Sequence, residues 1–252
     1  MPKFGEDVSL DKHQVGHFGF TATSLDGLES SGYTLATIVC DRSGSTAGFQ
    51  DAMEAALKAS VEALRKMPTA DSIMLRVLTV DDQCEEQHGF IPLADIDVMR
   101  YDGMLAPRGM TAMFDGLINA AQAAAAYGQQ LLRDRFNANG IVIGITDGLN
   151  NAGKFSTNGD LPKVREALTT TQLKECLESF TSVLIGVNLQ SSEVEQQLRL
   201  LHGEAGFSVP MIALKDADPK TIAKIGKFVT DSVSSTSQAL GTGAASQVNA
   251  TF

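Results

Sequence analysis

The chain has few of the features that mark disulfide-stabilised or membrane-spanning proteins. Its 252 residues include no tryptophan and only three cysteines, which are widely spaced and odd in number. We therefore expect free thiols, and neither a disulfide framework nor a zinc site. The N-terminal segment has no apolar core, and no apolar run approaches the ~18 residues of a membrane helix. These observations predict a soluble, cytoplasmic protein.

Basic residues are also scarce. The chain has 20 Lys and Arg against 30 Asp and Glu, a net charge of −10, with no basic cluster. An acidic balance of this size argues against a nucleic-acid-binding or anionic-membrane surface, although solubility alone is enough to explain it. The length allows one sizeable core. We expect an arm or short edge strand at residues 1–32, one domain at 33–238 and a disordered tail at 239–252.

Apolar runs of strand length alternate with segments of helical periodicity along the chain. This order predicts an α/β fold, with a doubly wound, mostly parallel six-stranded sheet and helices on both faces. A short polar connection precedes the third strand, so we expect a hairpin there and an antiparallel edge strand. The predicted strands are 33–40, 73–80, 88–93, 141–146, 182–188 and 209–214, and the predicted helices are about 50–67, 112–135, 162–179, 192–202 and 219–238.

Oxygen-bearing side chains follow the first of these buried strands, in the stretch LATIVCDRSGSTAG. Asp41, Ser43 and Ser45 alternate with other residues, so a near-extended turn can point all three at one place. The alternative without a ligand is an ordinary polar turn between a strand and a helix. The spacing nevertheless outlines a cation site at the carboxyl end of a strand.

Two later segments add oxygen ligands of the same kind. Asp147 directly follows the buried run IVIGIT, and Thr111 lies in a loop that leads into a helix, where it is also well placed to be the N-cap. Two carboxylates with three hydroxyls carry little excess negative charge. Such a set favours Mg²⁺ or Mn²⁺, which keep some waters and leave a position open for an outside ligand.

These residues, in this order, resemble the metal-ion-dependent adhesion site of von Willebrand factor A domains. The resemblance covers roughly residues 33–235 and is strongest to bacterial and phage intracellular members, including those associated with tellurite resistance. It implies a Rossmann-like fold and a bound Mg²⁺, with a partner protein supplying an Asp or Glu to the open position. The implied metal ligands are Asp41, Ser43, Ser45, Thr111 and Asp147, with the two aspartates acting largely through water.

Other site types fit the sequence less well. Gly148 to Lys154 matches the first part of a phosphate-binding loop, but Phe155 stands where Ser or Thr should hold Mg²⁺. An aspartyl-phosphate nucleophile at Asp41 would need a second acid at position 43, which is Ser. The four histidines are scattered, and no Ser or Cys has a base at motif spacing. No catalytic residue is predicted.

We therefore expect a Mg²⁺-dependent protein-interaction module and not an enzyme. Two alternatives stay open at this point. One is a metal-dependent phosphoester hydrolase, suggested by the metal chemistry and the Lys154 loop. The other is an assembly subunit with a vestigial metal site, in which the N-terminal arm mediates self-association. The sequence does not select an oligomeric state.

Overall fold

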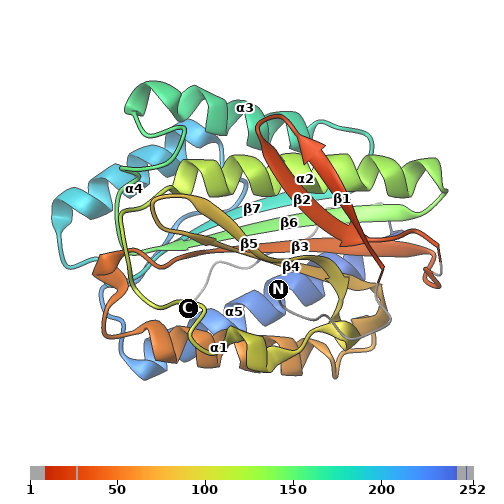
Figure 1. Cartoon of the computed structure of the whole chain (residues 1–252), viewed down its shortest axis with the longest axis horizontal. Coiled ribbons are helices and arrows are strands. Elements are labelled where there is room, and N and C mark those ends of the chain that lie inside the picture. Colours follow the sequence, from red (N-terminus) through yellow and green to blue (C-terminus); the bar gives the residue numbers. More distant parts are fainter. Residues whose placement is uncertain (1–8, 27, 243–247, 249–252) are drawn as a thin grey trace.

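Eight strands form one mixed sheet in the described part of the computed structural model, which covers residues 9–26, 28–242 and 248 (Figure 1). Their order is β1-β2-β5-β4-β3-β6-β7-β8, so the expected six-stranded sheet is too small by two strands. The strands are β1 Leu10–Val15, β2 Phe18–Thr23, β3 Gly32–Asp41, β4 Ile73–Val80, β5 Cys84–Pro92, β6 Asn137–Thr146, β7 Ser179–Gly186 and β8 Ile212–Ala213.

The centre of the sheet is parallel, as predicted. β3 is buried along its whole length and pairs in parallel with β4 on one side and β6 on the other. β6 continues in parallel to β7, and β7 to β8. Strands buried on both faces need apolar side chains at every position, which explains the unbroken runs of Val, Ile and Leu in the sequence.

Helices cover both faces of this sheet (Figure 1). Alternate residues of β3 point to opposite faces. Leu35 and Val39 pack with α2, α3 and α4, whereas Ile38 and Cys40 pack with α1 and α5. No helix in the described part of the chain combines the length and apolarity needed to cross a membrane. The helices are α1 Gln50–Leu64, α2 Met113–Arg133, α3 Leu161–Gln172, α4 Ser192–Ala205 and α5 Pro219–Ala239.

The prediction of an antiparallel edge strand is half right. β5 does pair antiparallel with β4, but it is not an edge, because the β1–β2 hairpin extends the sheet beyond it. β2 lies within residues 1–32, for which an arm or one short edge strand was expected. β1 was not expected, because its sequence LDKHQV is mostly polar and its side chains are exposed or only half-buried.

A buried ion pair attaches the hairpin to the sheet. The guanidinium of Arg76 in β4 is fully buried and donates to Glu86 at 2.6 Å and to Asn119 of α2 at 3.0 Å. Glu86 in turn accepts from the backbone N–H and the hydroxyl of Thr21, at 2.9 and 2.7 Å. Because a buried charge is costly unless it is paired, these bonds fix where β2 crosses β5.

Several element ends differ from the expected ones. The predicted helix 162–179 stops at Gln172, because a turn follows in which Glu178 N–H already donates to Ala138 O at 2.7 Å. The predicted strand 209–214 shrinks to Ile212–Ala213. α5 extends to Ala239, and most of the tail expected to be disordered, residues 243–247 and 249–252, lies outside the described residues.

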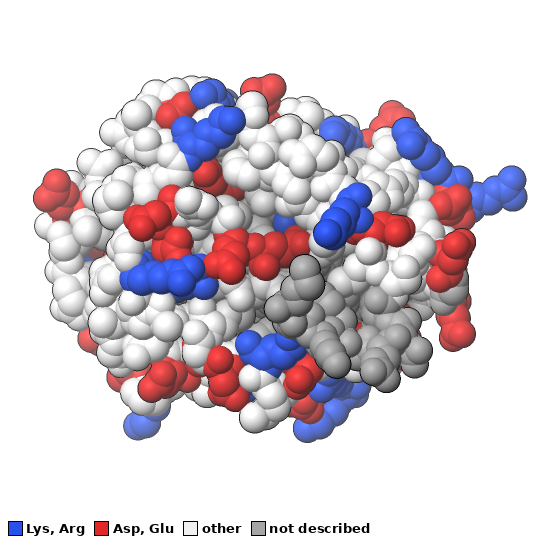
Figure 2. All heavy atoms as spheres, in the orientation of Figure 1, with Lys and Arg blue, Asp and Glu red and all other residues white. Residues whose placement is uncertain are grey.

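Charged side chains of both signs share the face of the molecule shown in Figure 2. Several acidic groups lie side by side across the middle of this view, with basic groups near them, and the basic residues do not form a patch on that face. The arrangement matches the acidic composition of the chain. A surface of this kind does not provide the continuous positive stripe that follows a nucleic-acid backbone.

Gly89 in β5 is required by the close approach of β2. A Cβ atom at this position would lie 2.0 Å from Thr21 O, a backbone atom that cannot move aside cheaply. We expect G89A to lower the free energy of unfolding in urea by about 1–3 kcal/mol. The matched control is G203A in exposed helix α4, where a Cβ meets nothing within 4 Å and alanine should be neutral or stabilising. Equal effects of the two variants would contradict this reading.

His88 in β5 makes folding stability depend on pH. Burial lowers the pKa of this imidazole from 6.5 to about 4, and its ring nitrogens lie 2.8 Å from the Tyr101 hydroxyl and 3.0 Å from Gly89 O. Between pH 6.5 and 4, His88 is therefore protonated in the unfolded chain and neutral in the folded chain. The contribution of His88 to the free energy of unfolding is complete above pH 6.5 and falls by up to about 3 kcal/mol as the pH drops toward 4. Urea unfolding across this window should show the wild type losing stability relative to H88Q as the pH falls.

Candidate metal centre

The two candidate carboxylates lie side by side because β3 and β6 are neighbours. Asp41 is the last residue of β3, and Asp147 directly follows β6. The strands run parallel with Cys40 opposite Ile145, so both acids emerge at the same edge of the sheet. The chain leaves β3 toward β4 on one side, while β6 lies on the other. The site therefore occupies the switch point where α/β sheets place their ligands.

Hydrogen bonds join four of the five candidate ligands into one cluster, and Thr111 lies beside them. Ser45 Oγ donates to Asp147 Oδ1 at 2.7 Å and lies 3.0 Å from Ser43 Oγ. Ser43 N–H donates to Asp41 Oδ1 at 2.8 Å. The hydroxyls of Ser45 and Thr111 both face Gly148, 3.7 and 3.9 Å from where its Cβ atom would lie. The structure thus brings together all the residues that the sequence selected.

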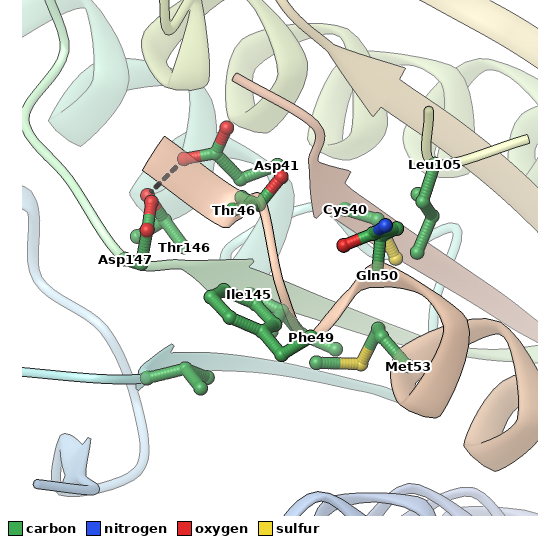
Figure 3. A pocket seen from close by; sticks show the side chains of 11 residues that line it. Cys40, Asp41, Thr46, Phe49, Gln50, Met53, Leu105, Ile145, Thr146 and Asp147 are labelled. Carbon is green, nitrogen blue, oxygen red and sulfur yellow. Dashed lines mark hydrogen bonds between the residues drawn. The ribbon is translucent and has the colours of Figure 1, made fainter. Parts of the chain in front are cut away.

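Thr146 belongs to the cluster although the sequence did not single it out. Its hydroxyl donates to Asp41 Oδ2 at 2.6 Å, the contact marked by a dashed line in Figure 3. Gly148 N–H donates back to the same hydroxyl at 3.1 Å. Thr146 therefore fixes the orientation of one carboxylate and the turn that carries the other. A hydroxyl at the last position of an otherwise apolar strand was the available signal.

Arg42 points away from the cluster. It is buried, and its Nε donates to Asp81 Oδ2 at 2.9 Å, while Glu85 pairs with its terminal nitrogen. Exposed Arg108 binds the same Asp81 oxygen at 2.6 Å. The backbone joins these loops as well, since Arg108 N–H donates to Arg42 O at 2.9 Å. The positive charge next to the site is thus neutralised by two acids and serves to hold the loops together.

Thr111 is not the N-cap of α2, which corrects the expectation from sequence. The cap position is Ala112, without a side-chain bond. Thr111 N–H instead donates to Asn151 Oδ1 at 2.8 Å, and Asn150 Oδ1 accepts from Phe114 N–H, also at 2.8 Å. Side chains from the loop after β6 therefore satisfy the first turn of α2, and the Thr111 hydroxyl stays available to the cluster.

The loop that resembled a phosphate-binding loop uses its backbone amides internally. Lys154 N–H and Phe155 N–H donate to the two oxygens of the Asp115 carboxylate, at 2.8 and 2.9 Å. Asn151 N–H and Ala152 N–H donate to Thr111 O at 2.9 and 3.1 Å. A phosphate would have to displace these bonds, so the geometry does not favour nucleotide binding at this loop.

Beneath the cluster lies a small cavity between β3, β6 and the start of α1 (Figure 3). Phe49, Met53, Leu105 and Ile145 line it together with Asp41 and other residues of the strand ends. Its volume of about 10 Å³ is near the lower limit for a single water. The cavity cannot hold an organic ligand, so any chemistry of the cluster takes place on its outer side.

Both carboxylates resist ionisation where they stand. Burial raises the pKa of Asp147 to about 6. The hydrogen bond from Ser45 lowers this pKa, whereas the nearby negative charge of Asp41 raises it further. Burial also raises the pKa of Asp41, although hydrogen bonds, the strongest from Thr146, oppose the rise. Two buried carboxylates at one point favour either a proton or a cation.

The chemistry of the cluster suits a hard divalent cation. It offers two carboxylates and three hydroxyls, and oxygen-only ligation is typical of Mg²⁺ and Mn²⁺. Among the described residues there is no group of three or more His, Cys, Asp or Glu side chains that could hold a metal. A metal centre in this part of the chain would therefore depend on the hydroxyls of Ser43, Ser45 and Thr111.

Comparison with solved structures supports the fold. Proximal thread matrix protein 1 from the mussel byssus shares 23% identity over 79% of this chain and 45% of its own, with a TM-score of 0.52. The pilus adhesin SpaC of Lactobacillus rhamnosus GG aligns over 92% of this chain and 36% of its own, at 11% identity and a TM-score of 0.62. The PilB minor pilin of Streptococcus sanguinis is 14% identical over 84% of this chain and 64% of its own, with a TM-score of 0.57.

At these identities the likeness establishes a shared fold and no more. One structure of the mussel protein is described as having a zinc-occupied MIDAS motif, and this description concerns that protein. The chain spans less than two thirds of each of these proteins. A scan against protein-family models finds no match, and a search of curated proteins finds no similar sequence.

The charge on Asp147 should destabilise the metal-free protein. D147N keeps an oxygen that can accept the Ser45 bond while removing the negative charge beside Asp41. We expect it to raise the free energy of unfolding in EDTA at pH 7 by on the order of 1 kcal/mol. The folded-state pKa near 6 exceeds the ordinary value of 3.8, so the gain is present above pH 6 and disappears as the pH falls toward 4.

The control for this prediction is D216N, which removes an equal charge from an exposed position before α5. Its effect in the same urea titrations should stay within about 0.5 kcal/mol. If D147N were instead as destabilising in EDTA as a lost structural hydrogen bond, the two carboxylates would not repel each other as described.

Proposed function

We propose that this chain is a Mg²⁺- or Mn²⁺-dependent protein-binding module. In this proposal the cation is held by the five clustered residues and keeps one open position, which the Asp or Glu side chain of a partner protein fills. The observation behind the proposal is the convergence of two carboxylates and three hydroxyls at one edge of the sheet. The ligands are Asp41, Ser43, Ser45, Thr111 and Asp147.

Binding is favoured over catalysis by what surrounds the cluster. His88 bonds Tyr101 in the interior, and His202 lies 2.7 Å from Val209 O. The other two histidines contact the hairpin and Phe155, so the described histidines lie in other contacts and do not supply a base to the cluster. The similar structures are a matrix protein, a pilin and an adhesin, which supports an interaction module.

The rim of the cluster offers features that a partner would contact. Met110, next to Thr111, is a large apolar side chain that is 51% exposed. Arg108 is exposed on the same loop, with Asp81 bound to its inner side. In the proposed complex, Met110 packs against apolar groups that flank the partner's carboxylate, and Arg108 selects against a basic neighbour.

The subtype and location belong to the proposal as well. We assign the chain to the intracellular, bacterial or phage type of von Willebrand factor A domain, and place it in the cytoplasm. The supporting observation is that all three cysteines are free, two of them buried, as is usual in a reducing compartment. Neither an assembly role nor phosphoester hydrolysis has a comparable observation in its favour.

Divalent cations should stabilise the folded protein through the hydroxyl ligands. In thermal unfolding, Mg²⁺ and Mn²⁺ should raise the midpoint steadily as their concentration increases, and the folded state should gain about 2.7 kcal/mol at one hundred times the Kd. S45A preserves both carboxylates but removes a predicted direct ligand, so its response to either metal should be strongly reduced.

The matched control is S192A, at an exposed serine that begins α4 far along the chain from the cluster. This variant should respond to metal as the wild type does. A metal response of equal size in the wild type and S45A would place the cation elsewhere, and no response in the wild type would defeat the proposal.

A further inference from the structure

The turn of the N-terminal hairpin contacts the loop that carries Asp147. The His17 and Phe18 rings lie 6.0 and 6.3 Å from the ring of Phe155, and Phe18 meets it edge to face. Figure 1 shows the hairpin crossing α2 with its turn near α3. Lys163 of α3 places its ammonium 4.5 Å from the Phe155 ring centre. Phe155 is therefore held from two sides.

Phe155 is bonded through its backbone to the first turns of α2. Its N–H donates to Asp115 Oδ1 at 2.9 Å, and its carbonyl accepts from Asn150 Nδ2 at 2.9 Å. Gly153, between them, has positive φ, and a Cβ there would lie 2.7 Å from Asp115 Oδ2. The loop thus passes so close to α2 that a shift of Phe155 must move the residues before it.

Those residues reach the candidate ligands directly. Asn150 also accepts from Phe114 N–H at the start of α2, and Asn151 exchanges two hydrogen bonds with the backbone of Thr111. A continuous series of contacts therefore runs from the hairpin turn through Phe155 to the loops of Thr111 and Asp147. The series consists of single hydrogen bonds and ring contacts outside regular secondary structure.

The hairpin itself is attached to the sheet mainly at its other end. The register between β2 and β5 consists of one pair, Ala22 with Phe90, and the Glu86 bonds to Thr21 are adjacent to it. The turn at Gly16 and His17 extends past this anchor. Its position depends on packing against Phe155 and α2, and local opening is easiest for segments with so few attachments.

We propose that the docked hairpin turn positions the loop after β6 and thereby sets the affinity of the metal centre for divalent cations. His17, Phe18 and Phe155 are positioning residues in this scheme, since none of them belongs to the ligand cluster. Docking holds Thr111 and Asp147 in the ligand geometry before the ion arrives, which lowers the ordering cost of binding. This inference rests on the proposed function.

The test is the Kd of Mg²⁺ and Mn²⁺, measured by calorimetry on the full chain with the metal alone as ligand. F18A removes the edge-to-face contact, and N150A removes the bonds to Phe114 and Phe155. Each should weaken binding by roughly three- to tenfold. F18Y, which keeps the ring, should restore wild-type affinity.

The matched control is L10A, which also removes a half-buried apolar side chain from this hairpin, but at its far end. Its metal affinity should equal that of the wild type even if its stability falls as much as that of F18A. By reciprocity, Mg²⁺ should slow hydrogen exchange in β1 and β2 of the wild type and not of F18A.

Three outcomes decide the inference. The inference is supported if the wild type binds the metal, F18A and N150A bind it more weakly, and L10A binds it with wild-type affinity. Wild-type binding with equal affinity in all four proteins overturns the hairpin coupling alone and leaves the proposed function standing. Absence of saturable binding by the wild type overturns both.

Discussion

Parallel pairing of β3 with β6 is the constraint on which the rest of this structure depends. It places Asp41 and Asp147, which are distant in sequence, at the same edge of the sheet. The apolar side chains that bury both strands provide the stability that tolerates two carboxylates at that edge. Without this pairing the serines and the threonine would be ordinary turn residues. The site is therefore a consequence of sheet topology as much as of its short motif.

The loops at this edge are held mainly by hydrogen bonds between side chains and backbone. Asn150 and Asn151 hydrogen-bond the loop after β6 to the start of α2 and the residues before it. On the β4 side of the cluster, Arg42 and Arg108 both pair with Asp81. Such bonds align groups without burying large apolar areas. They suit the proposed function, in which this surface presents a cation to a partner, and the proposed response to contacts made farther away by the hairpin turn.

Much of this architecture could be predicted from sequence because the signals were local. Continuous apolar runs identified β3, β4 and β6, and the polar residues at their ends gave the cluster, whose metal binding remains a prediction. β1 could not be predicted, because LDKHQV has no strand signal without its partner β2. Asn150 and Asn151 act on residues about forty positions away, so no spacing rule reveals them.

The most direct test of the central claim is a crystal structure grown with Mn²⁺ in acetate, with anomalous diffraction locating the metal. We expect one strong anomalous peak among the five ligands, at the roughly 2.0–2.2 Å from direct oxygen ligands that is typical of small hard cations, with an acetate oxygen at the open position. Saturating Mn²⁺ with no peak at the ends of β3 and β6, or with its peak elsewhere on the chain, would contradict the account.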